Sequence, residues 1–147
     1  MTSSAHQVLC FRLAEQDYAV QILEVKEIRR FTPTTSVPDA PSYMLGVINL
    51  RGTVVPVFDL RLRFGTGEAH VDRNTAIIVV TVGARNVGLV VDSVTRVLNI
   101  SDEMLRPVPQ FAGSIDSSFL LGLIEAGESL VTWLDVRRLL GAELEAA

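Results

Sequence analysis

An internal duplication constrains the fold of this chain more than any other feature of its sequence. Residues 18–28 and 87–97 place large apolar side chains at the same positions. Residues 54–61 match residues 130–137 at a slightly larger offset, and both members of this match contain the sequence Asp-x-Arg. Self-similarity of this kind indicates that one structural unit is used twice, with a short insertion inside the second copy.

The duplication divides the chain into two units, residues 8–65 and residues 77–141, with a polar, Gly-containing linker at residues 66–76. Each unit contains short β-rich runs separated by turn residues, which is typical of hairpins. Val outnumbers Leu in the sequence, which also favours strands. Asp59 and Asp135 each precede an apolar residue and an Arg, so we expect both to be N-caps of one or two helical turns.

Units of about 60 residues with four or five short strands predict small closed barrels, because closure removes exposed strand edges. A unit of this size is only marginally stable alone, so we expect the two barrels to share a hydrophobic core. Trp133 and Cys10 are interpreted as parts of the apolar filling. Pro56 lacks an amide proton, so we expect it at a strand edge or at a bulge.

Composition excludes several classes of protein. The net charge of −4 and the pI of about 5.1 argue against nucleic-acid binding. The longest apolar runs are about five residues, which predicts no membrane insertion, and the N-terminus shows no export signal. The single Cys10 permits no intrachain disulfide and fits a reducing cytoplasm. His6 and His70 lie far apart in polar surroundings, so no metal site is expected.

No catalytic motif is present in the sequence, and we expect no enzyme activity and no cofactor. Asp59 and Asp92 are the side chains that an alternative enzymatic function would use, although their places in the repeat favour structural caps or turns. A peptide-binding module of the SH3 sort is another alternative. It would need an exposed aromatic groove, and the chain has only six Phe, two Tyr and one Trp.

The two copies differ at positions that otherwise correspond. Glu27 stands where the second copy has Arg96, and residues 49–52, which include Arg51, align with residues 125–128, which contain two Glu. This asymmetry suggests that Val25, Glu27 and Arg51 belong to a site, since Arg is favoured at interfaces for its directional contacts. The alternative interpretation is a solvated Glu and an exposed turn Arg that contribute little.

Residues 46–61 closely resemble the signature of the CheW-like chemotaxis coupling proteins. Four further segments are also similar to that family, and the resemblance covers residues 8–141. These segments are residues 25–28, 37–41, 88–94 and 105–111.

The resemblance implies a single CheW-like domain over residues 1–147, mainly β, with two SH3-like five-stranded barrels around a shared core and short helical turns. It implies an adaptor without a cofactor, a metal or a small-molecule substrate, located in the cytoplasm and recruited to receptor arrays. Its expected partners are the cytoplasmic tip of methyl-accepting receptors and the regulatory domain of a CheA-type histidine kinase. The alternative is the same role in a chemotaxis-like pathway for surface motility or development.

The resemblance also assigns residues to two contacts. It places Val25, Glu27 and Arg51 in a groove between the barrels that receives the receptor tip. It places Arg106 and Phe111 at a kinase or ring-forming contact of the second barrel, while the kinase also meets the first barrel end to end. The family often has an acid where this chain has Gln110, so a charge pair is not expected there. The length leaves no room for a fused receiver domain.

Overall fold

The structure is a computed structural model that describes residues 6–65, 70–108 and 119–145. These residues form mainly short strands, with two 3₁₀ turns and two α-helices. In chain order the elements are β1 (His6–Leu13), β2 (Gln16–Gln21), η1 (Ile22–Glu24), β3 (Val25–Arg30), β4 (Met44–Leu50), β5 (Thr53–Asp59), α1 (Leu60–Phe64), β6 (Ala76–Val82), β7 (Arg85–Val91), β8 (Ser93–Ile100), η2 (Asp102–Met104), β9 (Leu105–Arg106), β10 (Leu120–Ala126), β11 (Ser129–Leu134) and α2 (Val136–Glu145).

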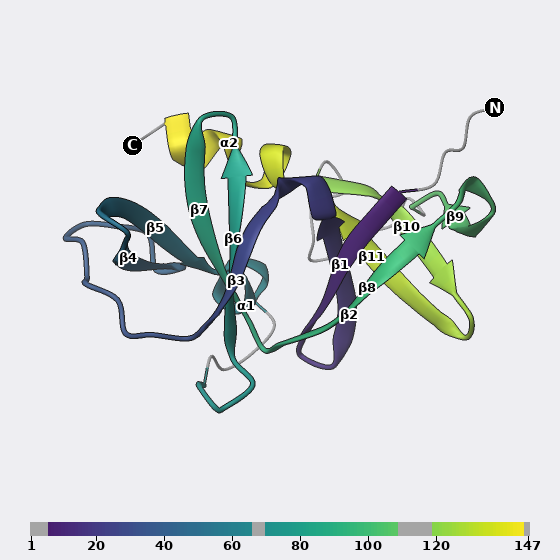
Figure 1. Ribbon diagram of the computed structural model, residues 1–147, viewed down its shortest axis with the longest axis horizontal. Coiled ribbons are helices and arrows are strands. Elements are labelled where there is room, and N and C mark those ends of the chain that lie inside the picture. The colour runs from purple at the N-terminus through teal and green to yellow at the C-terminus, as the bar shows by residue number, and fades with distance from the viewer. Residues whose placement is uncertain (1–5, 66–69, 109–118, 146–147) are drawn as a thin grey trace.

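The strands form two sheets that lie side by side as two lobes (Figure 1). The six-stranded sheet has the order β8-β1-β2-β11-β10-β9, and the five-stranded sheet has the order β3-β6-β7-β5-β4. The predicted fold class, mainly β with two SH3-like barrels and short helices, is confirmed. The six-stranded sheet exceeds the expected five strands only by β9, which has two residues.

The predicted subdomain boundaries, residues 8–65 and residues 77–141, do not match the sheets. β1 and β2 pair within the six-stranded sheet, whose other strands all come from the second half of the chain. β6 and β7 pair within the five-stranded sheet, whose other strands all come from the first half. Each half therefore gives its first hairpin to the sheet of the other half. Apolar alternation identifies a strand but not its neighbour, so the sequence could not reveal this exchange.

The parallel strand pairs show that the exchange follows the repeat. β5 pairs in parallel with β7, where Val57 lies opposite Gly88. β11 pairs in parallel with β2, where Trp133 lies opposite Ala19. Trp133 is the repeat equivalent of Val57, and Ala19 is the repeat equivalent of Gly88. The two lobes are therefore equivalent in register as well as in strand order.

The antiparallel pairs at the sheet edges obey the same equivalence. Glu27 of β3 lies opposite Val79 of β6, and Arg96 of β8 lies opposite Cys10 of β1. A register shift adjoins each of these pairs, which marks a β-bulge at the same place in both copies. β3 and β8 are thus equivalent edge strands, each with one side that pairs with no other described strand of its sheet.

The described residues form three clusters of buried apolar side chains. The largest joins both sheets, and each sheet also has a smaller cluster of its own. Strand β1 shows why its sequence is almost continuously apolar: Leu9 and Phe11 enter the shared cluster, whereas Val8 and Cys10 belong to the six-stranded sheet's own cluster. A strand buried on both faces cannot alternate with polar residues. The shared core that we expected is therefore confirmed.

The two α-helices begin at the predicted caps. An Asp59 carboxylate oxygen accepts a hydrogen bond from the Arg61 amide at 2.9 Å, and an Asp135 carboxylate oxygen accepts one from the Arg138 amide at 3.2 Å. α1 then ends at Gly65, whose φ of 66° is the left-handed conformation common at helix ends. Among the described residues, no helix is long and apolar enough to cross a membrane.

Two predictions about single positions need correction. Pro56 lies in β5, which is an interior strand between β4 and β7, so the expected edge or bulge is wrong. It is tolerated because the parallel pairs with β7 begin only at Val57. Trp133 is buried as expected, but it packs with Cys10 inside the six-stranded sheet rather than in the shared core.

Candidate functional site

An exposed ion-pair cluster forms where the expected receptor-binding residues lie. Glu27 on β3 forms an ion pair with Arg51, which occupies the turn between β4 and β5. Arg29, two residues further along β3, approaches the other Glu27 oxygen at 3.2 Å through Nη1. Arg51 is 65% exposed, whereas the Glu27 side chain is only 22% exposed. The structure therefore brings two of the three expected residues together and leaves Arg51 as the outermost member.

The β4–β5 turn fixes where Arg51 points. Arg51 and Gly52 both have positive φ angles, 51° and 85°, as a tight two-residue hairpin turn requires. The side chain of Asn49 accepts a hydrogen bond from the Gly52 amide at 2.9 Å, which closes the turn. The hairpin that we predicted around Arg51 is confirmed, and it holds the guanidinium against β3.

The charges of this cluster stabilise Glu27 in its ionised form. The hydrogen bond from Arg51 is the largest of the effects that hold the pKa of the Glu27 carboxyl below its ordinary value. Partial desolvation opposes this shift, and Arg29 adds to it. Glu27 is therefore a carboxylate over the physiological pH range, and the cluster keeps a net positive charge.

Val25 has a different position from the one its grouping with Glu27 suggested. Its side chain is half-buried and packs against the shared core. Arg29 was not among the expected site residues, although alternate residues of a strand project to the same side and its spacing from Glu27 could have indicated it. The ion-pair cluster consists of Glu27, Arg29 and Arg51, and Val25 lies on the same strand but outside it.

A groove of about 500 Å³ lies at the junction of the two sheets. It includes Glu24, which directly precedes Val25, and the exposed Leu23. Burial raises the pKa of the Glu24 carboxyl, and the nearby Arg137, whose Nε lies 3.5 Å from it, opposes that shift. The resemblance implied a groove between the barrels, but Val25, Glu27 and Arg51 do not line this one, and the sequence did not indicate its lining residues because they come from both halves of the chain. They are Gln21, Leu23, Glu24, Thr81, Gly83, Leu121, Asp135 and Arg137.

Arg106, expected at a second contact, lies on β9 at the outer edge of the six-stranded sheet. Its guanidinium forms a 2.9 Å ion pair with Glu125 and donates to the carbonyl of Glu103 at 2.8 Å. Its side chain is 47% exposed, so it is accessible and held in place. Phe111 and Gln110 lie outside the described residues. β9 lies at the far end of its lobe from β3 (Figure 1), so Arg106 belongs to a separate surface.

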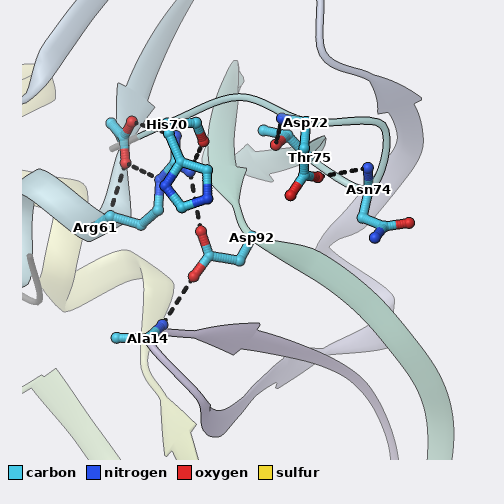
Figure 2. Close-up of polar contacts among 8 residues, drawn as sticks. Ala14, Arg61, His70, Asp72, Asn74, Thr75 and Asp92 are labelled. Carbon is cyan, nitrogen blue, oxygen red and sulfur yellow. Dashed lines mark hydrogen bonds and ion pairs between the residues drawn. The ribbon is translucent and has the colours of Figure 1, made fainter. Parts of the chain in front are cut away.

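The acids proposed for an enzymatic alternative belong to a buried structural cluster. Arg61, whose side chain is 3% exposed, contacts both Asp59 oxygens at 3.0 Å and Asp92 at 2.9 Å. It also donates to the His70 carbonyl at 2.6 Å, and the second Asp92 oxygen accepts from the Ala14 amide at 2.8 Å (Figure 2). Burial alone would lower the pKa of Arg61, but its bonds to the two carboxylates raise it.

This cluster explains the structural role predicted for Asp59. The residue caps α1 and also neutralises a buried cation, so its oxygens are committed to structure. Asp92 lies where β7 leads into β8, and it ties that point to the β1–β2 turn of the other sheet. The sequence contained the signal, the Asp-x-Arg motif, but in the second copy Arg137 is 73% exposed. The motif does not distinguish the buried Arg61 from the exposed Arg137, and the structure does.

Comparison with known proteins gives the family. A family model described as "CheW-like domain" matches residues 7–144. The chain belongs to the CheW-like family. It is 39% identical over 137 residues to "Chemotaxis protein CheW" from Klebsiella aerogenes, which covers 93% of this chain and 82% of that protein. It is 37% identical over 142 residues to "Probable chemotaxis protein CheW" from Rhizobium etli, covering 96% of this chain and 92% of the relative.

Two further relatives extend the comparison. The scaffolding protein TtCheW from Thermoanaerobacter tengcongensis has a solved structure that superposes with a TM-score of 0.85 at 30% identity, covering 94% of this chain and 89% of that one. "Protein FrzA" from Myxococcus xanthus is 32% identical over 120 residues, covering 82% of this chain and 74% of that protein. The resemblance inferred from residues 46–61 is therefore confirmed, and so is the two-lobed fold.

Proposed function

We propose that this protein is a chemotaxis adaptor that joins the cytoplasmic tip of methyl-accepting receptors to the regulatory domain of a CheA-type histidine kinase. Membership of the CheW-like family supports the adaptor role in chemotaxis. We place it in the cytoplasm, recruited to membrane-receptor arrays. The observation that carries the receptor contact is the Glu27–Arg51 ion pair, whose residues differ between the two copies of the repeat.

The geometry of this cluster suits a helical partner. A receptor tip is an α-helical hairpin with an apolar stripe, which can lie along a strand edge and a neighbouring groove. Arg51 is exposed, and its partner Glu27 keeps a second cation, Arg29, within 3.2 Å. Arg51 can therefore turn to a carboxylate of the partner without leaving Glu27 uncompensated. Such charged contacts set register and partner choice more than affinity.

The kinase contact is proposed on the other surfaces. Arg106 offers an ordered guanidinium at the outer edge of the six-stranded sheet, and Phe111 completes the proposed contact. We place a further kinase contact at the end of the first barrel, which meets the regulatory domain of the kinase end to end. Separate faces are what an adaptor needs, because receptor and kinase must bind at the same time, and tethering within an array lets each contact be weak.

The alternative is the same adaptor role in a chemotaxis-like pathway for surface motility or development. The similarity to "Protein FrzA", a relative that is not named as a chemotaxis protein, supports this alternative. Deleting the gene separates the two. Loss of swimming towards attractants supports the chemotaxis pathway, and loss of surface spreading alone supports the other.

Arg51→Glu tests the receptor contact. We expect circular dichroism and the melting temperature to stay near wild type, because Arg51 is 65% exposed, while binding of a receptor fragment and receptor-dependent kinase activation fall. Arg96→Glu makes the same charge change at an exposed position of β8, the repeat equivalent of Glu27, and as the control it should retain both activities. If Arg51→Glu is folded and couples receptor to kinase normally, the assignment is wrong.

A further inference from the structure

The edge strand β3 has a second set of side chains that the ion-pair cluster does not use. Lys26, Ile28 and Arg30 are its exposed residues, and we call them the β3 stripe. Ile28 is 47% exposed between the two cations. Together with Glu27, Arg29 and Arg51, the stripe gives this edge four cations and one carboxylate, a net charge of +3 on a chain whose total is −4. The sign of this edge is therefore opposite to that of the whole molecule.

The equivalent strand β8 provides an internal reference for the β3 stripe. Its exposed residues at the equivalent positions are Thr95, Val97 and Asn99. Val97 is 50% exposed, almost the same as Ile28, so the apolar centre is kept in both copies. The flanking positions differ: they are neutral in β8 and cationic in β3.

Protection against strand pairing does not explain this difference. Charged side chains on edge strands prevent sheets from joining edge to edge. β8 is an edge strand with the same bulge, and its exposed cation, Arg96, lies at the position of Glu27, with none at either flanking position. One cation is therefore enough on the equivalent edge, and edge protection does not account for both Lys26 and Arg30 on β3.

We propose that Lys26, Ile28 and Arg30 extend the receptor-docking surface and select a helix whose apolar stripe is flanked by carboxylates. This inference rests on the proposed function, since it names the chemistry of the partner at the same site. Ile28 and Arg30 project to the opposite side of β3 from Glu27 and Arg29, so a helix that contacts both sets lies along the free edge of this strand. Ile28 meets the apolar stripe, and Lys26 and Arg30 meet the acids on either side of it.

Because the whole chain is acidic, Lys26 and Arg30 also affect how an acidic partner approaches it. A net charge of −4 repels an acidic partner at long range, so the +3 edge is what attracts it in the correct orientation. Attraction of this kind acts mainly on the association rate and weakens as salt screens it over about 10 Å at 0.1 M. The inference therefore predicts a salt dependence that is specific to this edge.

The test replaces the two cations of the β3 stripe with the residues found at the equivalent positions of β8. The double variant Lys26→Thr with Arg30→Asn copies the β8 residues, which an equivalent backbone already accommodates at Thr95 and Asn99. The control Arg73→Gln with Arg96→Gln removes the same number of charges from exposed positions elsewhere. Binding of a cytoplasmic hairpin fragment of a methyl-accepting receptor from the same genome is measured by calorimetry and stopped flow at low and high salt, with light scattering as a check for edge-to-edge association.

We expect the stripe variant to lose affinity by about three- to tenfold at low ionic strength, mostly through the association rate, and to show a flatter salt dependence than wild type. The control should change affinity by less than about twofold. If the stripe variant binds like wild type while Arg51→Glu does not, or if stripe and control variants fall equally, this inference is wrong and the proposed function stands. If wild type does not bind the fragment at all, the proposed receptor contact fails and this inference fails with it.

Discussion

Replacing Arg61 with Met tests whether the buried cluster of Figure 2 is a main source of stability. Met keeps a long unbranched chain but removes the guanidinium that contacts Asp59 at 3.0 Å and Asp92 at 2.9 Å. Asp59 is 1% exposed, so its carboxylate would remain in the core with the backbone amide of residue 61 as its remaining donor among the described residues. Asp92 is 33% exposed and can recover water, so it adds less to the loss.

The magnitude follows from the burial of Asp59. Removing one partner of a buried ion pair costs about 3–5 kcal/mol, because an uncompensated charge stays in a medium of low polarity. For a chain of this size each kcal/mol lowers the melting temperature by roughly 2–4 °C, so the expected loss is roughly 6–20 °C. Arg137→Met is the matched control, since Arg137 is the repeat equivalent of Arg61 and is 73% exposed. We expect it to cost about 1 kcal/mol or less.

Urea unfolding followed by circular dichroism measures both variants and a third, Arg61→Met combined with Asp59→Asn. The double variant should recover much of the loss, because the unpaired buried charge is gone and Asn can still cap α1. The reasoning is refuted if Arg61→Met unfolds at the same urea concentration as Arg137→Met. It is also refuted if the double variant is no more stable than the single one.

Three further predictions concern single positions. Gly46→Ala should cost about 3 kcal/mol or more in urea unfolding, because its Cβ would lie 2.1 Å from the carbonyl oxygen of residue 35, whereas Gly52→Ala, with no atom within 4 Å, should cost about 1 kcal/mol. Glu27→Gln should flatten the loss of stability measured from about pH 5 to pH 3. Arg51 lowers the pKa of the Glu27 carboxyl below 4.5, so the stability that Glu27 contributes is present above pH 4.5 and disappears as the pH falls through the lowered pKa. An unchanged slope of stability against pH in the variant would contradict this. Cys10 should react slowly with a thiol reagent in the folded protein and rapidly in urea, because it is 2% exposed and burial raises its pKa; equal rates would contradict its place in the core.

Much of the local structure could be predicted from the sequence because it depends on neighbouring residues. The hairpin at Arg51 and Gly52 needs only turn residues between two apolar runs. The caps at Asp59 and Asp135 need only a side-chain oxygen ahead of a helical turn. The apolar neighbours of Cys10 predict a core position for the same kind of reason, and the structure buries this residue.

The tertiary arrangement could not be predicted, because it depends on which strands become neighbours. Residues 8–65 contribute strands to both sheets, so the contiguous subdomains we expected mix the two lobes. The burial of Arg61 and the exposure of Arg137 show the result. Asp92 reaches Arg61 from beyond β7 at 2.9 Å, whereas Arg137 faces Glu24 at 3.5 Å from an exposed position. Equal motifs therefore acquired different environments that no local pattern records.

The exchange of hairpins also explains how the two lobes can serve as one adaptor. Because each sheet takes strands from both halves, neither half can complete a sheet alone, and the lobes are held in a fixed relation by shared strands rather than by a linker. Because of the repeat, a residue in one copy can be compared with its equivalent in the other. Buried equivalents such as Val57 and Trp133 differ in size but both stay apolar. Exposed equivalents such as Lys26 and Thr95 differ in charge, which the common backbone does not require. Because charge differences between exposed equivalent residues are not needed for folding, they are the differences that can make each lobe specific for its own partner.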